Sequence, residues 1–349
     1  MKKILALLLA LVMVLGLVAC GAKEEAPAAQ EEAPAVKEEA PAEEAPAEEE
    51  GKKYNMTFIM PVRNEFNTAM EAGMLAMCDE LSVNLTTQDV NNDSSKIIQF
   101  VESARNAGDD AVVVLPVDSE TIPQIKEAAG DMKLIIVNRA PANTSIFSGD
   151  LVFVGSNEND AGNFQGEYLA QVLKEKGETV AKPIILLGTV GAENTTMRTE
   201  SAKAALANAG LEVEVVAELA ANWDRADAMT KIQPLLTTAD YNCIIANNDS
   251  MALGAVEALQ SVGLDPADVP VVGIDATVDG LDAVEAGTMA MTVFQDAAGQ
   301  GTGSIIAAIN LIEGKSIIDG TDYTVDAENG NLVWIPFIPV YQADVPNFR

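Results

Sequence analysis

Histidine is absent from the 349-residue chain, and cysteine, aromatic residues and positive charge are all scarce. Without histidine the chain lacks Ser-His-Asp and Cys-His nucleophiles, histidine acid–base catalysis and most kinds of catalytic zinc site. Three cysteines are too few for a disulfide framework or a four-thiolate metal site. Lys and Arg number 21 against 53 Asp and Glu, and the resulting net charge of −32 argues against nucleic acid or an anionic lipid surface as a partner.

Sequence motifs for cofactors and metals are also missing. There is no Gly-x-Gly-x-x-Gly fingerprint, no Gly-x-x-x-x-Gly-Lys-Ser/Thr phosphate loop and no EF-hand spacing of carboxylates. Hydrolysis of a glycosidic bond needs two carboxylates that face that bond, and no such pair stands out among the acidic residues. We therefore expect no cofactor, no metal and no enzymatic activity, with a glycoside-processing enzyme as the weakest alternative.

The first 20 residues resemble a bacterial lipoprotein signal. Lys2 and Lys3 form a basic head, residues 4–19 are uncharged and almost wholly apolar, and Leu-Val-Ala precedes Cys20. An apolar run of this length is short for a spanning helix, which needs about 20 residues, and is typical of a secretory signal. We expect residues 1–19 to be removed and Cys20 to carry the lipid anchor. The alternative is an uncleaved N-terminal anchor helix.

Residues 20–53 form a separate segment of Glu, Ala and Pro. Between residues 21 and 50 there are 11 Glu and 2 Lys in variants of Glu-Glu-Ala-Pro-Ala. Such a segment cannot bury apolar surface and its like charges repel, so we expect a disordered tether; the alternative is a partner-binding tail. Residues 1–20 contribute +2 and residues 21–50 contribute −9, which leaves −25 for the remainder.

From Tyr54 onward, short β-branched runs alternate with Ala-rich amphipathic segments. This pattern predicts two doubly wound parallel sheets covered by helices on both faces. Ser94 and Asp249 are candidate N-caps, and Cys78 and Cys243 are expected as buried thiols rather than a disulfide pair. The expected strands are 54–62, 83–90, 111–117, 134–137, 184–187, 213–217, 243–246, 271–274 and 289–294. The expected helices are 66–81, 95–107, 121–129, 195–208, 225–236, 251–261, 278–286 and 299–313.

Polar side chains follow several of these strands. Ligands of open parallel sheets bind beyond the carboxyl ends of the strands, so recurrence of amides and carboxylates there favours a shared polar cleft. Each one taken singly is typical of a turn or cap. They are Arg63, Asn64, Glu65, Asn138, Arg139, Asn247, Asn248, Asp249, Asp275, Gln295 and Asp296.

Amides and aromatic rings at these positions suit a sugar. An Asn side chain both donates and accepts, a carboxylate accepts from hydroxyls, and the apolar C–H faces of a sugar lie well against aromatic planes. Trp223 lies in the polar string Asn-Trp-Asp-Arg at a helix start, which favours ligand stacking at least as much as core packing. Phe66 occupies an equivalent loop, where it either stacks on ligand or staples the following helix.

At these residues the chain resembles the type I periplasmic sugar-binding proteins of ABC transporters, and among them the glucose/galactose-binding subgroup. The most specific segment is Ile245–Leu259, with sequence IANNDSMALGAVEAL. The resemblance runs from about Tyr54 to Pro336. It is supported by Val-Gly-Ile-Asp-Ala at 272–276, Phe-Val-Gly at 153–155, Val137-Asn138 with Pro141, Asn-Trp-Asp at 222–224 and Gly314-Lys315.

The resemblance implies roles for individual residues. Phe66 and Trp223 would hold the sugar ring from the two domains, and Asn138, Arg198, Asn248 and Asp275 would bind its hydroxyls. Four positions depart from the glucose/galactose pattern. Asn64 and Asn194 replace aspartates, Ala192 replaces a histidine and Gln295 replaces an asparagine. Because lost charge-assisted hydrogen bonds weaken recognition, the resemblance leaves the identity of the sugar open.

The resemblance also implies a two-lobed periplasmic-binding-protein type I fold with a three-segment hinge. The chain would cross between lobes near Ser156, Phe294 and Leu332. The N-terminal lobe would then contain residues 54–156 and 295–332, and the C-terminal lobe residues 157–294 and 333–349. The subgroup's calcium loop has no counterpart at Lys176–Lys182, so no metal is expected there.

The function that follows is capture of a monosaccharide, galactose- or glucose-like, for an ABC importer. The protein would be a monomer on the extracytoplasmic face of a bacterial cell membrane, with a permease and ATPase complex as its partner. The alternative output is a sensor that presents a sugar or signal molecule to a chemoreceptor or sensor kinase. A transcriptional repressor of related fold would need a basic DNA-binding headpiece, which the N-terminus does not supply.

Overall fold

The computed structural model describes residues 53–349. The expectations for the signal, Cys20 and nearly all of the tether lie outside the described residues. Residues Glu50–Arg349 form one compact unit, and four clusters of buried apolar side chains lie within residues 54–348. This part of the chain therefore carries its own hydrophobic cores.

The first lobe is built on a seven-stranded sheet that is parallel except for one edge strand. Its order is β13-β14-β5-β4-β3-β1-β2, and β13 runs antiparallel to β14. The strands are β1 (Tyr54–Met60), β2 (Val83–Asp89), β3 (Ala111–Val114), β4 (Lys133–Val137), β5 (Leu151–Gly155), β13 (Thr324–Val325) and β14 (Leu332–Trp334). Strands β2 and β3 lie on opposite sides of β1 and run parallel to it, which is the doubly wound arrangement that the alternating pattern predicted.

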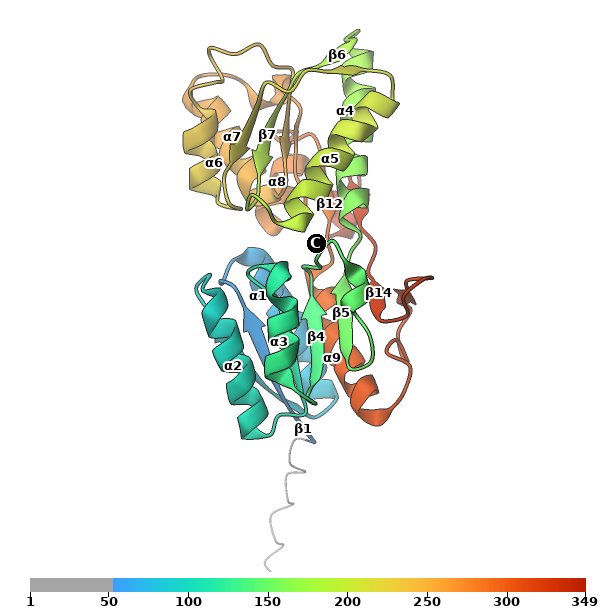
Figure 1. Cartoon of the computed structure of the whole chain (residues 1–349). Coiled ribbons are helices and arrows are strands. Elements are labelled where there is room, and N and C mark those ends of the chain that lie inside the picture. Colours follow the sequence, from blue (N-terminus) through green and yellow to red (C-terminus); the bar gives the residue numbers. More distant parts are fainter. Residues whose placement is uncertain (1–52) are drawn as a thin grey trace, which may run out of the picture. The chain divides into compact units, whose positions relative to one another are not determined.

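Helices cover both faces of this sheet. Strand β3 shows why: Val113 packs into one cluster with α1 and α9, whereas Val112 and Val114 pack into another with α2 and α3. Figure 1 shows α9, in orange, returning to the blue-green strands of the first lobe. The helices are α1 (Glu65–Glu80), α2 (Ser94–Ala107), α3 (Ile122–Ala129) and α9 (Ala297–Glu313).

The second lobe has a four-stranded parallel sheet in the order β11-β10-β7-β9. Its strands are β7 (Pro183–Leu187), β9 (Ala217–Ala220), β10 (Cys243–Ala246) and β11 (Val271–Val272). Its helices are α4 (Glu158–Glu175), α5 (Glu193–Asn208), α6 (Arg225–Ile232), α7 (Asp249–Ser261) and α8 (Val278–Glu285). Two strand pairs complete it: β12 (Thr292–Phe294) with β15 (Ile338–Val340), and β6 (Val180–Ala181) with β8 (Glu212–Val213).

Three segments carry the chain between the two sheets: the one between β5 and α4, the one between β12 and α9, and the one between β14 and β15. Val333 and Trp334 pair with Val154 and Gly155 of β5. The chain therefore leaves the first sheet after Trp334, later than the crossing expected near Leu332.

Several local expectations were wrong. The expected strand 213–217 is two strands, because β8 ends at Val213 and pairs with β6, whereas β9 begins at Ala217. The N-cap of α2 is Asp93, whose side chain accepts from the Ser95 amide, and not Ser94. The N-cap of α7 is Asn248 and not Asp249.

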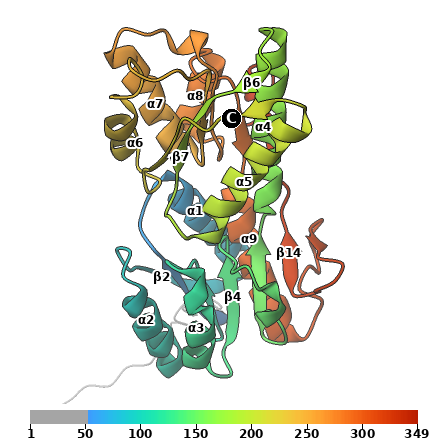
Figure 2. The same ribbon diagram turned by 45° about the horizontal axis from the view of Figure 1, so that its top comes forward.

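The expected helices do not include α4, whose sequence contains two helix-weakening glycines. These glycines have a packing role. A Cβ atom at Gly162 would clash with the backbone of Arg198, and one at Gly166 with that of Ala202. Figure 2 shows α4 beside α5. Cys78 and Cys243 are buried and form no disulfide, as expected.

Candidate ligand-binding site

All nine residues that the sequence singled out for ligand binding line one cavity of about 40 Å³. They come from both lobes. Asn64, Phe66 and Asn138 belong to the first, Asn194, Arg198, Trp223, Asn248 and Asp275 to the second, and Gln295 to a connecting segment. The convergence of strand and helix ends from two sheets makes this cavity the candidate site.

Asn64 and Asn248 have the same geometry in the two lobes. Each is an N-cap: Asn64 Oδ1 accepts from the Asn67 amide at 2.8 Å, and Asn248 Oδ1 accepts from the Met251 amide at 3.0 Å. The backbone donor fixes which amide atom faces the helix, and the Nδ2 group of each makes no hydrogen bond with another described residue. Both side chains can therefore donate to a ligand.

Asn138 has the opposite polarity. Its Nδ2 donates to Gln300 Oε1 at 3.0 Å, and Gln300 Nε2 donates to Ser156 Oγ at 3.1 Å. The Oδ1 atom of Asn138 remains as an acceptor for a ligand. The residue has φ +69°, a left-handed conformation that asparagine adopts more readily than most residues. Buried Gln300 thus links a cavity residue to the first connecting segment.

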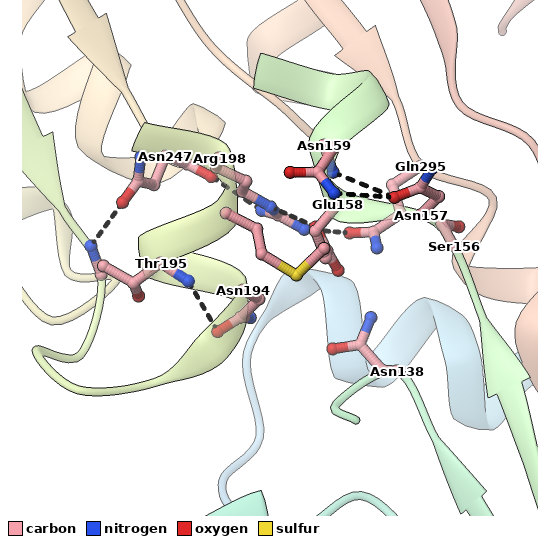
Figure 3. Close-up of polar contacts among 12 residues, drawn as sticks. Asn138, Ser156, Asn157, Glu158, Asn159, Asn194, Thr195, Arg198, Asn247 and Gln295 are labelled. Atoms are coloured by element: carbon pink, nitrogen blue, oxygen red, sulfur yellow. Dashed lines mark hydrogen bonds and ion pairs between the residues drawn. The ribbon is translucent and has the colours of Figure 1, made fainter. Parts of the chain in front are cut away.

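Arg198 is held by three buried acceptors (Figure 3). Its Nε donates to Glu158 Oε2 at 2.6 Å, its Nη1 to the Asn247 carbonyl at 2.7 Å and its Nη2 to Gln295 Oε1 at 3.1 Å. Only 3% of the Arg198 side chain is exposed. A guanidinium fixed at three corners presents its remaining N–H groups to the cavity with little freedom to reorient.

Burial raises the pKa of Glu158, and the charge of Arg198 is the largest opposing influence. Glu158 Oε1 and Gln295 Nε2 are buried and lack a hydrogen bond within standard geometry, although the Gln295 amide lies close enough to lower that pKa as well. Glu158 is the first residue of α4, directly after the connecting segment from β5, and Gln295 lies on the segment between β12 and α9. The network therefore ties Arg198 to two of the places where the chain passes between the lobes.

Asp275 supplies the only acidic side chain of the cavity lining. Its carboxylate makes no hydrogen bond with another described residue, and burial raises its pKa well above the usual range, opposed by Arg198. The backbone is in an unusual conformation here, with φ +120° at Asp275 and +54° at Ala276. Non-glycine residues with such angles are costly and cluster at ligand sites.

Trp223 and Phe66 supply the aromatic walls. Trp223 has φ +67°, its Nε1 donates to Thr189 Oγ1 at 3.0 Å, and its ring lies 5.8 Å from the Arg198 guanidinium carbon. A Cβ atom at Gly188 would clash with this ring. Both aromatic residues also pack partly against a hydrophobic core. Each ring thus packs against a core and also lines the cavity.

The positions that depart from the glucose/galactose pattern differ in location. Asn64, Asn194 and Gln295 line the cavity, whereas Ala192 lies outside it, in an adjoining cavity of about 350 Å³. Asn194 Oδ1 accepts from the Thr195 amide at 3.0 Å, which leaves its Nδ2 as a donor.

Two further residues, Arg139 and Asn67, line the cavity but were not selected from the sequence. Arg139 was visible as a strand-end residue, yet no motif distinguished it. Its Nη1 donates to the carbonyls of Pro116 and Val117, its buried Nε has no partner, and burial lowers its pKa to about 10. Asn67 lies in the first turn of α1, where no sequence pattern distinguished it.

Glu65 makes a direct side-chain contact across the cleft. It is the first residue of α1, and its Oε1 accepts from the amide of Val278, the first residue of α8, at 3.0 Å. Burial raises the pKa of Glu65, and hydrogen bonding to Val278 opposes the rise. A carboxylate from one lobe thus lies at the positive end of a helix of the other.

Asp249 is neither a cap nor part of the cavity lining. Its carboxylate is fully buried and accepts from Thr292 Oγ1 at 2.7 Å and from the Thr277 amide at 2.9 Å. Burial raises its pKa to about 7. It therefore holds the loop that carries Asp275 to the strand beside it.

Within residues 53–349, no three His, Cys, Asp or Glu side chains are grouped in a way that could hold a metal ion. None of the helices in this part of the chain combines the length and apolarity needed to cross a bilayer.

The fold and the site define a two-lobed α/β binding protein. A family model described as the periplasmic binding protein domain matches residues 56–316. A putative rhizopine-binding protein of Rhizobium meliloti is 34% identical over 293 residues, covering 82% of this chain and 89% of the relative. The ribose import binding protein of Salmonella typhimurium is 31% identical over 261 residues, covering 74% and 84%.

A solved structure gives the same result. The solute-binding protein of an ABC transporter from Bacillus halodurans, with bound myo-inositol, superposes with a TM-score of 0.74 at 30% identity, covering 85% of this chain and 97% of that one. The chain belongs to the periplasmic binding protein family and has its type I fold. It is an extracytoplasmic sugar-binding protein of the ABC-transporter class, a class of binding proteins and not of enzymes.

Proposed function

We propose that the protein, anchored through Cys20, captures a neutral ring-shaped polyol between its lobes and delivers it, as a monomer, to a permease and ATPase complex. One observation carries this proposal: side chains chosen from the sequence for sugar binding line a single cavity from both lobes. A ligand held there contacts both lobes at once, so its binding energy stabilises their closure.

The directions of the hydrogen bonds support a neutral polyol. The cavity offers donors from Asn64, Asn194, Asn248 and Arg198, and acceptors from Asn138 and Asp275. Hydroxyl groups both donate and accept, so a ring of hydroxyls matches such a mixture. Phe66 and Trp223 supply apolar surface for the C–H faces of the ring.

We infer that the ligand is a cyclitol such as myo-inositol, rather than the glucose- or galactose-like sugar expected from the subgroup resemblance. Relatives named for rhizopine and ribose and a structure with bound myo-inositol do not single out glucose or galactose. Asn64 and Asn194 turn donors to the cavity, whereas the subgroup pattern places carboxylate acceptors there. In the subgroup pattern the aspartate at position 194 meets the anomeric hydroxyl of the sugar, which a cyclitol lacks, and here that position is Asn194.

Calorimetry on residues 51–349, which contain the four hydrophobic cores described above, tests the proposal. We expect myo-inositol to bind more tightly than galactose, glucose, ribose or xylitol, and none to be consumed. Tighter binding of glucose or galactose would overturn the cyclitol assignment and keep the function. Absence of binding to every ring and chain polyol in the panel would overturn the function itself.

The anchor has its own test. Full-length protein expressed with radiolabelled palmitate should become labelled and remain with membranes. The Cys20→Ala variant should lose the label and retain the ligand affinity of the wild type. Labelling of Cys20→Ala, or membrane retention without label, would contradict the anchor.

A further inference from the structure

A second cavity, of about 130 Å³, adjoins the ligand cavity. The two share Asn138 and Asn194 as walls. The second cavity continues from this shared wall toward the connecting segments, where Ser156, Asn157 and Trp334 line it. Since a water molecule takes about 30 Å³ of liquid volume, the space is large enough for a small substituent of a ligand in the adjoining cavity.

The charges that line this cavity are all negative. Glu158 and Glu193 contribute carboxylates, and no Lys or Arg lines it. Each of the other four cavities described in residues 53–349 has at least one basic side chain in its lining. A cavity with two carboxylates and no cation favours a positively charged group over an anion.

Neither carboxylate is fully satisfied by the protein. Glu193 is half-buried and makes no hydrogen bond or ion pair with another residue of the described chain. Glu158 is 95% buried and uses Oε2 for Arg198, while its Oε1 lacks a hydrogen bond. Figure 3 shows the Glu158 carboxylate between Arg198 and Asn138, the latter a wall of both cavities.

Aromatic rings also line the cavity. Trp334 and Phe153 both line the cavity and meet edge to face, with ring centroids 5.7 Å apart. Trp334 Nε1 donates to Asp326 Oδ2 at 3.1 Å, which fixes the orientation of the indole. Aromatic faces attract cations, tryptophan most strongly. Carboxylates and aromatic faces around one small space are the usual surroundings of a bound ammonium group.

We propose that this cavity is a subsite for a primary amine carried by the ring-shaped ligand, so that the physiological ligand is an amino-substituted polyol. The inference rests on the proposed function, because the ring itself occupies the adjoining cavity. The ammonium group would lie between the Glu193 carboxylate and the Trp334 ring, with Glu158 as the deeper acceptor. Loss of its hydration is offset by these contacts only when the ring is bound.

The test compares two rings that differ only in the amine. The probes are scyllo-inositol and 1-amino-1-deoxy-scyllo-inositol, because all six hydroxyl positions of scyllo-inositol are equivalent and one replacement gives a single isomer. Calorimetry at pH 7 on residues 51–349 should give about tenfold or greater preference for the amine. Equal affinities, or tighter binding of scyllo-inositol, would overturn the subsite and leave the proposed function standing.

Substitutions test whether the preference for the amine depends on Glu193. Glu193→Gln should reduce the ratio of amine affinity to neutral-ring affinity to about one, because it removes the carboxylate but keeps its shape. Glu200→Gln, on the same helix but outside the cavity lining, is the matched control and should keep the wild-type ratio. An unchanged ratio in Glu193→Gln would overturn the subsite. If neither of these two rings binds the wild type, the subsite fails. The proposed function fails with it only if no polyol of the calorimetric panel binds either.

Discussion

At the scale of single residues, recognition depends on which atom of each side chain the protein has already engaged. The side-chain oxygens of Asn64, Asn194 and Asn248 accept from backbone amides, so their Nδ2 groups are left to donate to a ligand. Asn138 gives its Nδ2 to Gln300, so its oxygen remains. The same residue type therefore serves as donor at three positions and as acceptor at a fourth.

Asn64→Asp tests this division. An aspartate still caps α1, because its carboxylate accepts from the Asn67 amide as Asn64 does. Its second oxygen would accept from a ligand where Asn64 donates. We expect the affinity for myo-inositol to fall about tenfold or more, because the N–H donor of Asn64 is replaced by a carboxylate oxygen that can only accept. The melting temperature should change little.

Asn143→Asp is the matched control for Asn64→Asp. Asn143 caps a short 3₁₀ helix outside the ligand cavity, so the affinity should match that of the wild type. Unaltered myo-inositol affinity in Asn64→Asp would show that Nδ2 does not contact the ligand.

Trp223→Ala tests the stacking wall. Loss of a buried aromatic contact of about 1.5–3 kcal/mol corresponds to a roughly tenfold to hundredfold loss of affinity. Because Trp223 is only partly buried against its core, the melting temperature of the ligand-free protein should change little. A large fall in that temperature with retained affinity would instead establish a packing role. Gly188→Ala should mimic the affinity loss by displacing the ring.

At the scale of elements, helix ends carry the contacts that bring the lobes together. The first residue of α1 binds the first amide of α8, and Thr277, the N-cap of α8, follows the strained loop that carries Asp275. The loop between β11 and α8 thus reaches both the ligand cavity and the opposite lobe. Binding of ligand at Asp275 and closure at Val278 are expected to reinforce each other.

Glu65→Gln tests this contact. Gln can still accept from the Val278 amide but without the charge, and a neutral hydrogen bond is about half as strong. Nearby Asp279 raises the pKa of Glu65 and Arg225 lowers it. We expect myo-inositol to dissociate about threefold to tenfold faster in stopped-flow measurements at pH 7.

Glu80→Gln, at the far end of α1, is the control for Glu65→Gln. Glu80 is exposed and is not part of the contact. Its dissociation rate should equal that of the wild type, and an equal rate in Glu65→Gln as well would remove any role for the interlobe bond.

At the scale of the whole molecule, buried acids make stability depend on pH in an unusual direction. Burial raises the pKa of Asp249 to about 7 and also raises those of Asp275 and Glu158. Between the unfolded value of about 4 and the folded value, the folded state holds more protons than the unfolded state. Stability therefore decreases as pH rises through this window.

Other ionisable groups determine how far the pH can fall before the folded state loses stability. Hydrogen bonds from Lys315, Tyr54 and Lys53 lower the pKa of Glu313 to about 2. Its contribution is present above the unfolded value and is lost as pH falls toward 2. Repulsion among the −25 net charges of residues 51–349 also weakens as the pH falls from neutrality. The whole molecule should thus be most stable in mildly acidic solution.

Calorimetric melting of residues 51–349 from pH 3.5 to 8 checks this expectation. The wild-type melting temperature should be highest near pH 4–5 and decline toward pH 7. Asp249→Asn should decline less, because the amide can accept from the Thr277 amide and donate to Thr292 Oγ1 without ever becoming charged. A maximum at pH 7–8 in the wild type, or an identical slope in Asp249→Asn, would refute the assignment.

The sequence by itself determined the class of fold and most of the residues that line the cavity, Arg139 and Asn67 excepted. Alternating strands and helices dictate a doubly wound sheet, and the carboxyl ends of its strands converge. Asn138, Asn248, Asp275 and Gln295 could therefore be suspected from their positions. Arg63, Asn247 and Asp296 also follow strands but do not line the cavity, and the family resemblance was needed to separate the two groups. The sequence did not predict which residue caps each helix. Asp93 and Asn248 are the N-caps of α2 and α7, where Ser94 and Asp249 were expected.

Only the tertiary structure decided how these residues act. The pairing of Arg198 with Glu158, the bond from Glu65 to α8, and the meeting of Glu193 with Trp334 around one cavity join segments far apart in the chain. No periodicity records such contacts, because they depend on how two lobes pack and on which polar atoms burial leaves without partners. The sequence specified a polar cleft between two lobes, and packing assigned its donors, acceptors and charges.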